Sequence, residues 1–203
     1  MRADFDPIEL LDEWFADSRD DVARIEGRMA WWFGQDADRD RRLAQRHAQD
    51  VEAAASGVWG GLDAEAGGRL ALILLLDQLP RNIHRGTPRA FASDTLALDL
   101  CLHGHDLGMD SSLTAIERVF FWMPLQHVED LELQDLGVRL YDSLVDEDPA
   151  NADLWRGFAR YSRLHNQIIA KFGRFPHRNA VLDRESTPEE AAWLAENGTR
   201  FGQ

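Results

Sequence analysis

The sequence predicts an all-α protein whose eight to nine helices stack as antiparallel hairpins in a bundle or a short solenoid. Three observations support this fold class. Apolar residues recur every three or four positions over most of the 203 residues. Residues typical of helix caps and helix breakers divide this pattern into segments of helical length. The connections are short, which favours antiparallel neighbours. A chain of this length fits one domain, so residues 1–203 are expected to form a single helical domain.

The first half of the chain predicts four helices. They are expected over residues 7–16, about 20–33, about 38–55 and 64–79. Asp6 is a suitable N-cap and Pro7 a suitable first residue for the first helix. The third helix is strongly charged and ends before Gly57. The longest apolar run, Leu70–Leu76, is poor in β-branched residues, so the fourth helix is expected to be central and fully buried.

The second half predicts the remaining helices. They are expected from Thr87 to near Gly104, over about 112–123, over 130–146, over about 149–171 and over 188–196. Pro124 is expected to end the second of these. In the last helix Thr187, Pro188 and Glu190 stand in the order of a capping box, and Asn197-Gly198 is expected to close it.

Apolar stripes predict which faces of these helices are buried. The helix that follows Thr87 is expected to bury Phe91, Leu96, Leu98 and Leu102. The next two stripes consist of Leu133, Leu136, Leu140 and Leu144, and of Leu154, Phe158, Tyr161, Leu164 and Ile168.

The net charge limits the partners of this protein. The chain has 36 acidic against 22 basic residues, a formal net charge of −14. Such a charge repels phosphate backbones and anionic lipid head groups, so neither nucleic-acid binding nor membrane binding is expected. The apolar run Leu70–Leu76 is too short to span a bilayer. Cys101 is the single cysteine, and the N-terminal residues are acidic where a signal peptide is apolar, so a cytoplasmic location is expected.

Several common catalytic motifs are absent from the sequence. It has no P-loop, no GxGxxG after a strand and no GxSxG elbow, which counts against nucleotide hydrolysis, Rossmann redox chemistry and serine acyl transfer. Cys101 lies in an apolar helix, where a thiol is more often packing than a nucleophile. No HExxH, CxxC or DxDxDG spacing occurs, so neither a metal nor a cofactor is expected.

The first of three polar clusters covers Asp77–Gly86, at the end of the most apolar helix. Polar groups carried so deep need partners. In a structural interpretation, they satisfy carbonyls freed by Pro80 and pair with Arg81. In a functional one, Arg81, Arg85 and Arg89, spaced four residues apart in an acid-free stretch, present guanidinium groups to an anion.

The second polar cluster covers Arg156–Asn179 and is the largest basic segment of the chain, with no carboxylate from Leu154 to Leu182. Gly173 and Pro176 predict a turn after a long helix, which would hold the polar side chains on a loop set by a rigid element. Alternatively, the basic residues complement the helix dipole and pair with surface acids.

The third polar cluster covers Met123–Asp130, where His127 is followed by two carboxylates. Either carboxylate could serve only as a cap of the next helix. Alternatively, His127, Glu129 and either His165 or His177 could converge as ligands or as an acid–base pair.

Three segments of the chain carry a resemblance to a known family. They are Asp77–Asn82 (DQLPRN), Met123–Asp130 (MPLQHVED) and Phe172–Asn179 (FGRFPHRN). In this order and spacing they resemble an uncharacterised bacterial family, domain of unknown function 924, nearly from end to end. The resemblance implies a single cytosolic domain with a tetratricopeptide-like helical fold, and it implies no activity.

The resemblance also implies which polar residues recur in the family. They correspond to Asp77, Gln78, Arg81, Asn82, His127, Glu129, Asp130, Gln134, His165, Arg174, His177, Arg178 and Asn179. Two positions depart from the family pattern, because Val128 stands where a Ser is usual and Asp183 where a Gly is usual. These departures count against a hydroxyl-dependent role at 128 and against a left-handed backbone at 183.

We hypothesise that the three clusters meet in one cationic groove that binds a small anionic metabolite or the carboxylate of a peptide terminus. Arg81, Arg174 and Arg178 would bind the anion. Asp77, Glu129 and Asp130 would orient these arginines. The expected ligand-binding residues are Asp77, Gln78, Arg81, Asn82, Arg85, Glu129, Asp130, Gln134, His165, Arg174, Arg178 and Asn179.

Two other interpretations remain open. In the first, the protein is a hydrolase or lyase in which His127 or His177 is the general base and Glu129 orients it. In the second, the polar clusters are purely structural. Self-association through an exposed aromatic surface is also possible for a chain with seven tryptophans, although most of them fall on apolar faces.

Overall fold

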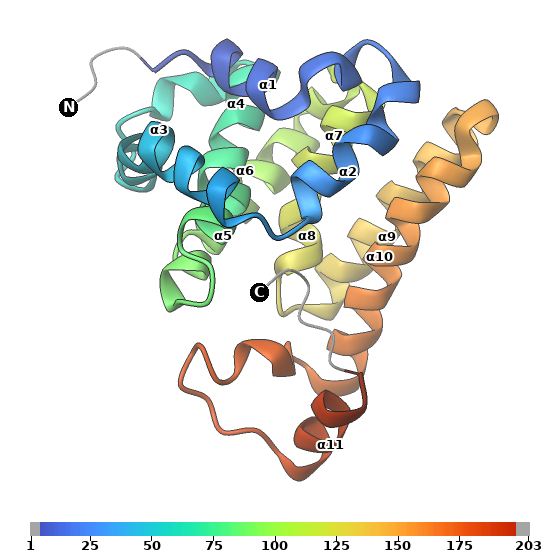
Figure 1. The fold of residues 1–203 in the computed structure, drawn as a ribbon. Helices are drawn as coiled ribbons and strands as arrows, with labels where there is room; N and C mark the ends of the chain where they lie inside the picture. Colours follow the sequence, from blue (N-terminus) through green and yellow to red (C-terminus); the bar gives the residue numbers. More distant parts are fainter. Residues whose placement is uncertain (1–4, 198–203) are drawn as a thin grey trace. The chain divides into compact units, whose positions relative to one another are not determined.

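The structure is a computed structural model that describes residues 5–197, and within that range it is helical with no strand (Figure 1). This confirms the all-α fold class. The chain divides into two compact units. Unit 1 comprises the chain up to Arg85 together with Arg89–Pro124, and unit 2 comprises Gly86–Pro88 and the chain from Leu125 onward. We describe each unit by itself.

Unit 1 is built from the helices of the first half of the chain and two that follow. They are α1 (Pro7–Phe15), α2 (Ile25–Phe33), α3 (Ala37–Ala55), α4 (Ala66–Ile73), α5 (Leu79–Ile83), α6 (Asp94–Asp106) and α7 (Ala115–Phe121). Asp6 caps α1 by accepting a hydrogen bond from the Ile8 N–H, and Asp36 caps α3 in the same way. The expected helices at 7–16 and 38–55 are therefore confirmed.

The central buried helix of unit 1 differs from an ordinary α-helix in its middle. Helices α4 and α5 are joined without a break by a π-helical segment, Leu74–Gln78, and every residue of Leu70–Leu76 is buried. Pro80 lies at the second position of α5, where a missing N–H is tolerated. The helix therefore continues to Ile83 rather than ending at residue 79.

The core of unit 1 is aromatic. Trp14 and Phe15 of α1 each pack edge-on against Phe120 of α7, with ring centroids 5.6 and 5.4 Å apart. Trp32 of α2 packs against the same ring at 4.9 Å and donates its indole N–H to the Trp14 carbonyl. Contacts of this kind add to the free energy gained from burying the rings.

The segment that follows residue 87 differs from the sequence prediction. Pro88–Phe91 is a 3₁₀ turn, and α6 begins only at Asp94. The buried face of α6 consists of its small residues Ala97, Cys101 and Gly104, whereas Leu96 is 43% exposed. The prediction was wrong for Leu96, whereas Phe91, Leu98 and Leu102 are half-buried.

Gly104 explains why α6 packs with its small residues inward. A Cβ atom at this position would lie 2.5 Å from Cδ of Arg69. The buried Arg69 guanidinium donates to the carbonyls of Leu100 and Asp63 and thereby ties α6 to the loop before α4. A larger residue at 104 would displace a buried, hydrogen-bonded arginine.

Unit 2 contains a helical hairpin and the C-terminal segment. Its helices are α9 (Leu131–Glu147), α10 (Ala152–Phe172) and α11 (Pro188–Asn197), and α8 (Met123–His127) crosses the boundary between the units. Helices α9 and α10 lie side by side along their length (Figure 1). Tyr141 and Leu144 of α9 and Trp155 and Phe158 of α10 are buried. The helices expected over 130–146 and 149–171 are confirmed.

Three local details from Pro124 onward correct the sequence prediction. Pro124 does not end a helix, because it is the second residue of α8, where no N–H is needed. Tyr161 and Leu164 are exposed rather than part of the buried stripe of α10. Asp183 has a φ of 52°, so this position is left-handed although it is not a glycine.

The end of unit 2 follows the predicted capping pattern. Gly173, with a φ of 68°, ends α10. Thr187 accepts a hydrogen bond from the Glu190 N–H, and the Glu190 carboxylate accepts one from the Thr187 N–H. This confirms the capping box of α11. Gly198, expected to close this helix, lies outside the described residues. Within residues 5–197, no helix combines the length and apolar character that a bilayer span requires.

Candidate functional site

Two of the three polar clusters meet in unit 2. His127 stands at the end of α8, His165 on α10, and His177 and Arg178 in the 3₁₀ turn Pro176–Arg178. We call these four residues the imidazole cluster. The polar cluster at Asp77–Gly86 belongs to unit 1, apart from its last residue.

Phe175 is the centre of the imidazole cluster. Its ring is fully buried and lies 5.7 Å from the His165 ring and 5.3 Å from the His177 ring. The Arg178 guanidinium lies over the same ring, 4.4 Å from its centroid. The His127 ring lies 6.1 Å from that of His165. One buried aromatic ring therefore sets the positions of two imidazoles and a guanidinium.

Two histidines of the cluster are neutral at physiological pH. Burial, together with the nearby His127, lowers the pKa of His165 to about 3. Burial and the positive charge of Arg178 lower the pKa of His177 to about 3 as well. His165 Nδ1 lies 2.8 Å from the Tyr161 carbonyl, which can only accept, so Nδ1 carries the proton and Nε2 is an acceptor.

Arg178 connects the turn to the end of α8. It is buried, and its Nη1 donates to the His127 carbonyl at 3.0 Å. This hydrogen bond joins the two polar clusters that lie 51 positions apart in the chain. The cluster is therefore a product of tertiary contacts and not of neighbouring sequence.

Glu129 holds the loop that carries the cluster. Its carboxylate accepts two hydrogen bonds from Arg184, at 2.7 and 2.9 Å, and one from the Phe175 N–H at 2.8 Å. Burial opposes ionisation of Glu129, but these bonds outweigh it and lower its pKa. The sequence hypothesis gave Glu129 the role of orienting Arg174 or Arg178. The arginine that it binds is Arg184, which the hypothesis missed.

The sequence feature that could have pointed to Arg184 is its position at the end of the acid-free stretch. Residues 154–182 lack carboxylates, and Arg184 follows directly, next to the unusual Asp183. The left-handed backbone at Asp183 turns the chain, and the Arg184 N–H donates to the Asn179 carbonyl at 2.8 Å. Arg184 also donates to the Phe175 carbonyl. A tight turn thus brings this guanidinium back to Glu129.

Arg174 has a carboxylate partner on the C-terminal helix. It donates two hydrogen bonds to Glu190, at 2.7 and 2.8 Å, and one to the Glu185 carbonyl. Hydrogen bonding by Arg174 lowers the pKa of the buried Glu190 to about 2. Asn179, which is fully buried, donates to Glu190 and Ser186. Both predicted ligand-binding residues thus hold α11 in place.

Asp130 and Gln134 have structural contacts at the start of α9. Asp130 caps this helix by accepting from the Leu133 N–H. The buried Gln134 donates to the carbonyls of Gln126 and Val128. These bonds fix the connection between α8 and α9, and with it the position of His127.

The polar cluster at Asp77–Gly86 is internally paired. Arg81 lies between two carboxylates, 3.1 Å from Asp77 and 2.9 Å from Asp94. Burial alone would lower the pKa of Arg81, but the two carboxylates outweigh it and raise that pKa. Gln78 donates to Asp77.

Asp40 of α3 pairs with the rest of this cluster. Asn82 donates to its carboxylate at 3.0 Å, and Arg85 does so at 3.1 Å. All five predicted ligand-binding residues of this cluster, Asp77, Gln78, Arg81, Asn82 and Arg85, have hydrogen-bond or ion-pair partners within unit 1. Their hydrogen bonds join the central helix to α3 and α6.

Metal and thiol chemistry find no support in the residues that the structure describes. Within residues 5–197, no group of three or more His, Cys, Asp or Glu side chains is arranged to hold a metal ion. Cys101 is buried, and burial together with Asp110 and Asp77 raises the pKa of its thiol well above the ordinary value. A thiolate nucleophile is therefore disfavoured at this position.

Comparisons with known proteins identify a family and a solved relative, both of unknown function. A family model described as "Bacterial protein of unknown function (DUF924)" matches residues 10–198. A solved protein of unknown function from Agrobacterium tumefaciens is 34% identical, with a TM-score of 0.79, over 94% of this chain and 97% of that one. The comparison with curated proteins finds no match.

Proposed function

The chain belongs to the bacterial family DUF924, which has no assigned function, and from its own residues we propose that it binds a small anion at the imidazole cluster. The observation that carries this proposal is the convergence of two imidazoles and a buried guanidinium on Phe175, with a third imidazole, that of His127, packed against His165. The anion would be a phosphate or a carboxylate of a metabolite. A cytoplasmic setting and a tetratricopeptide-like hairpin fold fit this function and are part of the proposal.

The charges around the cluster support anion binding. Arg178 belongs to the cluster, and Arg174 and Arg184 lie in the same loop region; the carboxylates of Glu190 and Glu129 are hydrogen-bonded to the latter two. The buried Arg178 acts in a medium of low effective dielectric, where its attraction for an anion is stronger than in water. This is a local excess of positive charge in a chain with a net charge of −14.

The neutral histidines suit a ligand that has both acceptors and a donor. A neutral imidazole can donate one hydrogen bond and accept one. His165 Nδ1 donates to the Tyr161 carbonyl, so Nε2 is the acceptor nitrogen of this ring. His127 and His177 are half-buried, so solvent and small ligands can reach them. A hydrogen phosphate or a hydroxycarboxylate has this combination of groups.

The geometry favours binding over acid–base catalysis. A general base works best with a pKa near the operating pH, whereas His165 and His177 have pKa values of about 3. Glu129 has a lowered pKa, and its oxygens already accept from Arg184 and Phe175. These groups position the site rather than exchange protons at neutral pH.

Thermal-shift measurements with inorganic phosphate and with malate test the proposal. We expect at least one of them, at a hundred times its Kd, to raise the melting temperature by several degrees. His177→Asn should remove most of that shift. The exposed His103 of α6 provides a matched control, because His103→Asn changes the same residue type away from the cluster. Absence of a shift with both anions, or an unchanged shift in His177→Asn, would overturn the proposal.

A further inference from the structure

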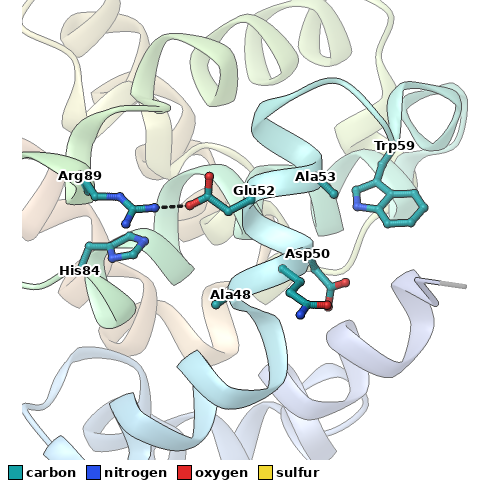
Figure 2. Close-up of a pocket in the computed structure, with 8 residues that line it drawn as sticks. Ala48, Asp50, Glu52, Ala53, Trp59, His84 and Arg89 are labelled. Carbon is teal, nitrogen blue, oxygen red and sulfur yellow. Dashed lines mark hydrogen bonds and ion pairs between the residues drawn. The ribbon is translucent and has the colours of Figure 1, made fainter. Parts of the chain in front are cut away.

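Unit 1 contains a hollow with a volume of about 370 Å³ that the proposed function does not use. One wall is the face of α3 that carries Ala48, Gln49, Glu52 and Ala53, together with the buried Asp50. His84, Arg89 and Trp59 complete the lining (Figure 2). A hollow of this size lies in the range of small-molecule sites.

The lining combines an apolar floor with an ion pair at the rim. Ala48 and Ala53 have no side chain beyond Cβ, which leaves the space above α3 open. Figure 2 shows Arg89 and His84 on one side of α3 and Trp59 on the other, with Arg89 paired to Glu52. The flat indole of Trp59 offers an apolar surface of low conformational entropy.

The ion pair between Arg89 and Glu52 is suited to exchange its partners. Both side chains are more than half exposed, 62% and 61%, so the pair itself contributes little to stability. His84, beside it, has a pKa that burial and the charge of Arg89 lower, so its imidazole adds no positive charge at neutral pH. The rim thus presents one cation and one anion to a ligand, and separating them costs little free energy.

We propose that this hollow binds a zwitterion with an apolar body, in the class of free amino acids with an apolar side chain. The ligand carboxylate replaces Glu52 on Arg89, and the ligand ammonium group takes the place of Arg89 on Glu52. The apolar body lies over Ala48 and Ala53 toward Trp59. A ligand with only a negative charge would be repelled by Glu52 and Asp50. A ligand with only a positive charge would be repelled by Arg89. This proposal is independent of the imidazole cluster, which belongs to unit 2.

Three probes that share one carbon frame test the charge requirement. Ligand-observed NMR titrations would compare L-phenylalanine, 3-phenylpropionate and 2-phenylethylamine. We expect phenylalanine to bind with a Kd on the order of 1 mM and about tenfold tighter than either singly charged probe. Equal or tighter binding of a singly charged probe, or no saturable binding of phenylalanine up to about 20 mM, would overturn the proposal.

Two charge-neutralising variants test the assignment of each end. Arg89→Gln should weaken phenylalanine binding about tenfold and tighten 2-phenylethylamine binding, because it removes a like charge and frees Glu52. Glu52→Gln should weaken phenylalanine binding and tighten 3-phenylpropionate binding for the corresponding reason. Arg156→Gln is a matched control, because Arg156 is also 62% exposed and pairs with Asp153 in unit 2. These positions are exposed, so the variants are expected to fold. Unchanged phenylalanine binding in both rim variants contradicts the proposal.

Discussion

Arg81 in unit 1 and Arg178 in unit 2 follow nearly the same local sequence, yet they have different surroundings. Arg81 is followed by Asn82 and stands after Pro80, and Arg178 is followed by Asn179 and stands two positions after a proline. Arg81 lies between two carboxylates, those of Asp77 and Asp94. Arg178 lies over Phe175, beside imidazoles, and donates to a backbone carbonyl.

This difference shows why the charge pattern along the chain does not identify a binding arginine. No acid stands between Asp77 and Asp94 in the sequence, yet these two carboxylates lie 3.1 and 2.9 Å from Arg81. Arg178 also belongs to an acid-free stretch, and its cluster is built largely from neutral rings. An ion pair across unit 1 and an imidazole cluster in unit 2 thus arise from similar motifs.

The largest expected effect is the loss of Arg81. Arg81→Met leaves the fully buried Asp77 and the neighbouring Asp94 without their shared cation, and we expect it to destabilise the protein by about 3–5 kcal/mol. Arg178→Met removes a hydrogen bond to a neutral carbonyl and should cost about 1–3 kcal/mol. Urea unfolding followed by circular dichroism measures both. Equal costs would remove the distinction between the two arginines.

The stability of the protein should fall in acid because of a buried histidine of unit 2. In the unfolded chain His165 takes up a proton below pH 6.5, whereas in the folded protein it does so only near pH 3. The free energy of unfolding therefore falls as the pH drops through this window. His165 alone accounts for a loss of about 1.4 kcal/mol per pH unit. His165→Gln should flatten the pH dependence of unfolding between pH 6.5 and 4.5. His103→Gln, at an exposed position, serves as a control for the loss of one imidazole.

A substitution in the turn that brings Arg184 to Glu129 should increase the stability of the protein. Asp183 has a φ of 52°, which costs an ordinary residue more than a glycine. We expect Asp183→Gly to raise the free energy of unfolding by about 0.5–1 kcal/mol. The same substitution at Asp153, on the exposed first turn of α10, should destabilise slightly. A destabilising Asp183→Gly would mean that the aspartate side chain holds the turn.

The smallest effect is expected at the rim of the hollow in unit 1. Arg89→Gln breaks an exposed ion pair with Glu52 and should change the free energy of unfolding by less than about 0.5 kcal/mol. Thermal unfolding compared with Arg81→Met checks this. A large loss of stability would show that Arg89 resembles Arg81 and is part of the folded framework.

The sequence determined where most helices lie, because caps and apolar periodicity are local. Asp6 and the Thr187–Glu190 capping box act on backbone groups within a few residues, and each was found where the pattern predicts it. The buried run Leu70–Leu76 was equally clear from composition. Membership of the family was visible in three short motifs.

Only the tertiary structure decided which charged groups meet. Asp40 is 45 positions from the Arg85 that it binds, and Glu129 is 55 positions from Arg184. The inward face of α6 likewise depended on Arg69, which is 31 positions from the carbonyl it binds. Which charged and packed groups interact depends on their distance in space. Neither the hydrophobic periodicity nor the order of charges along the chain gives that distance.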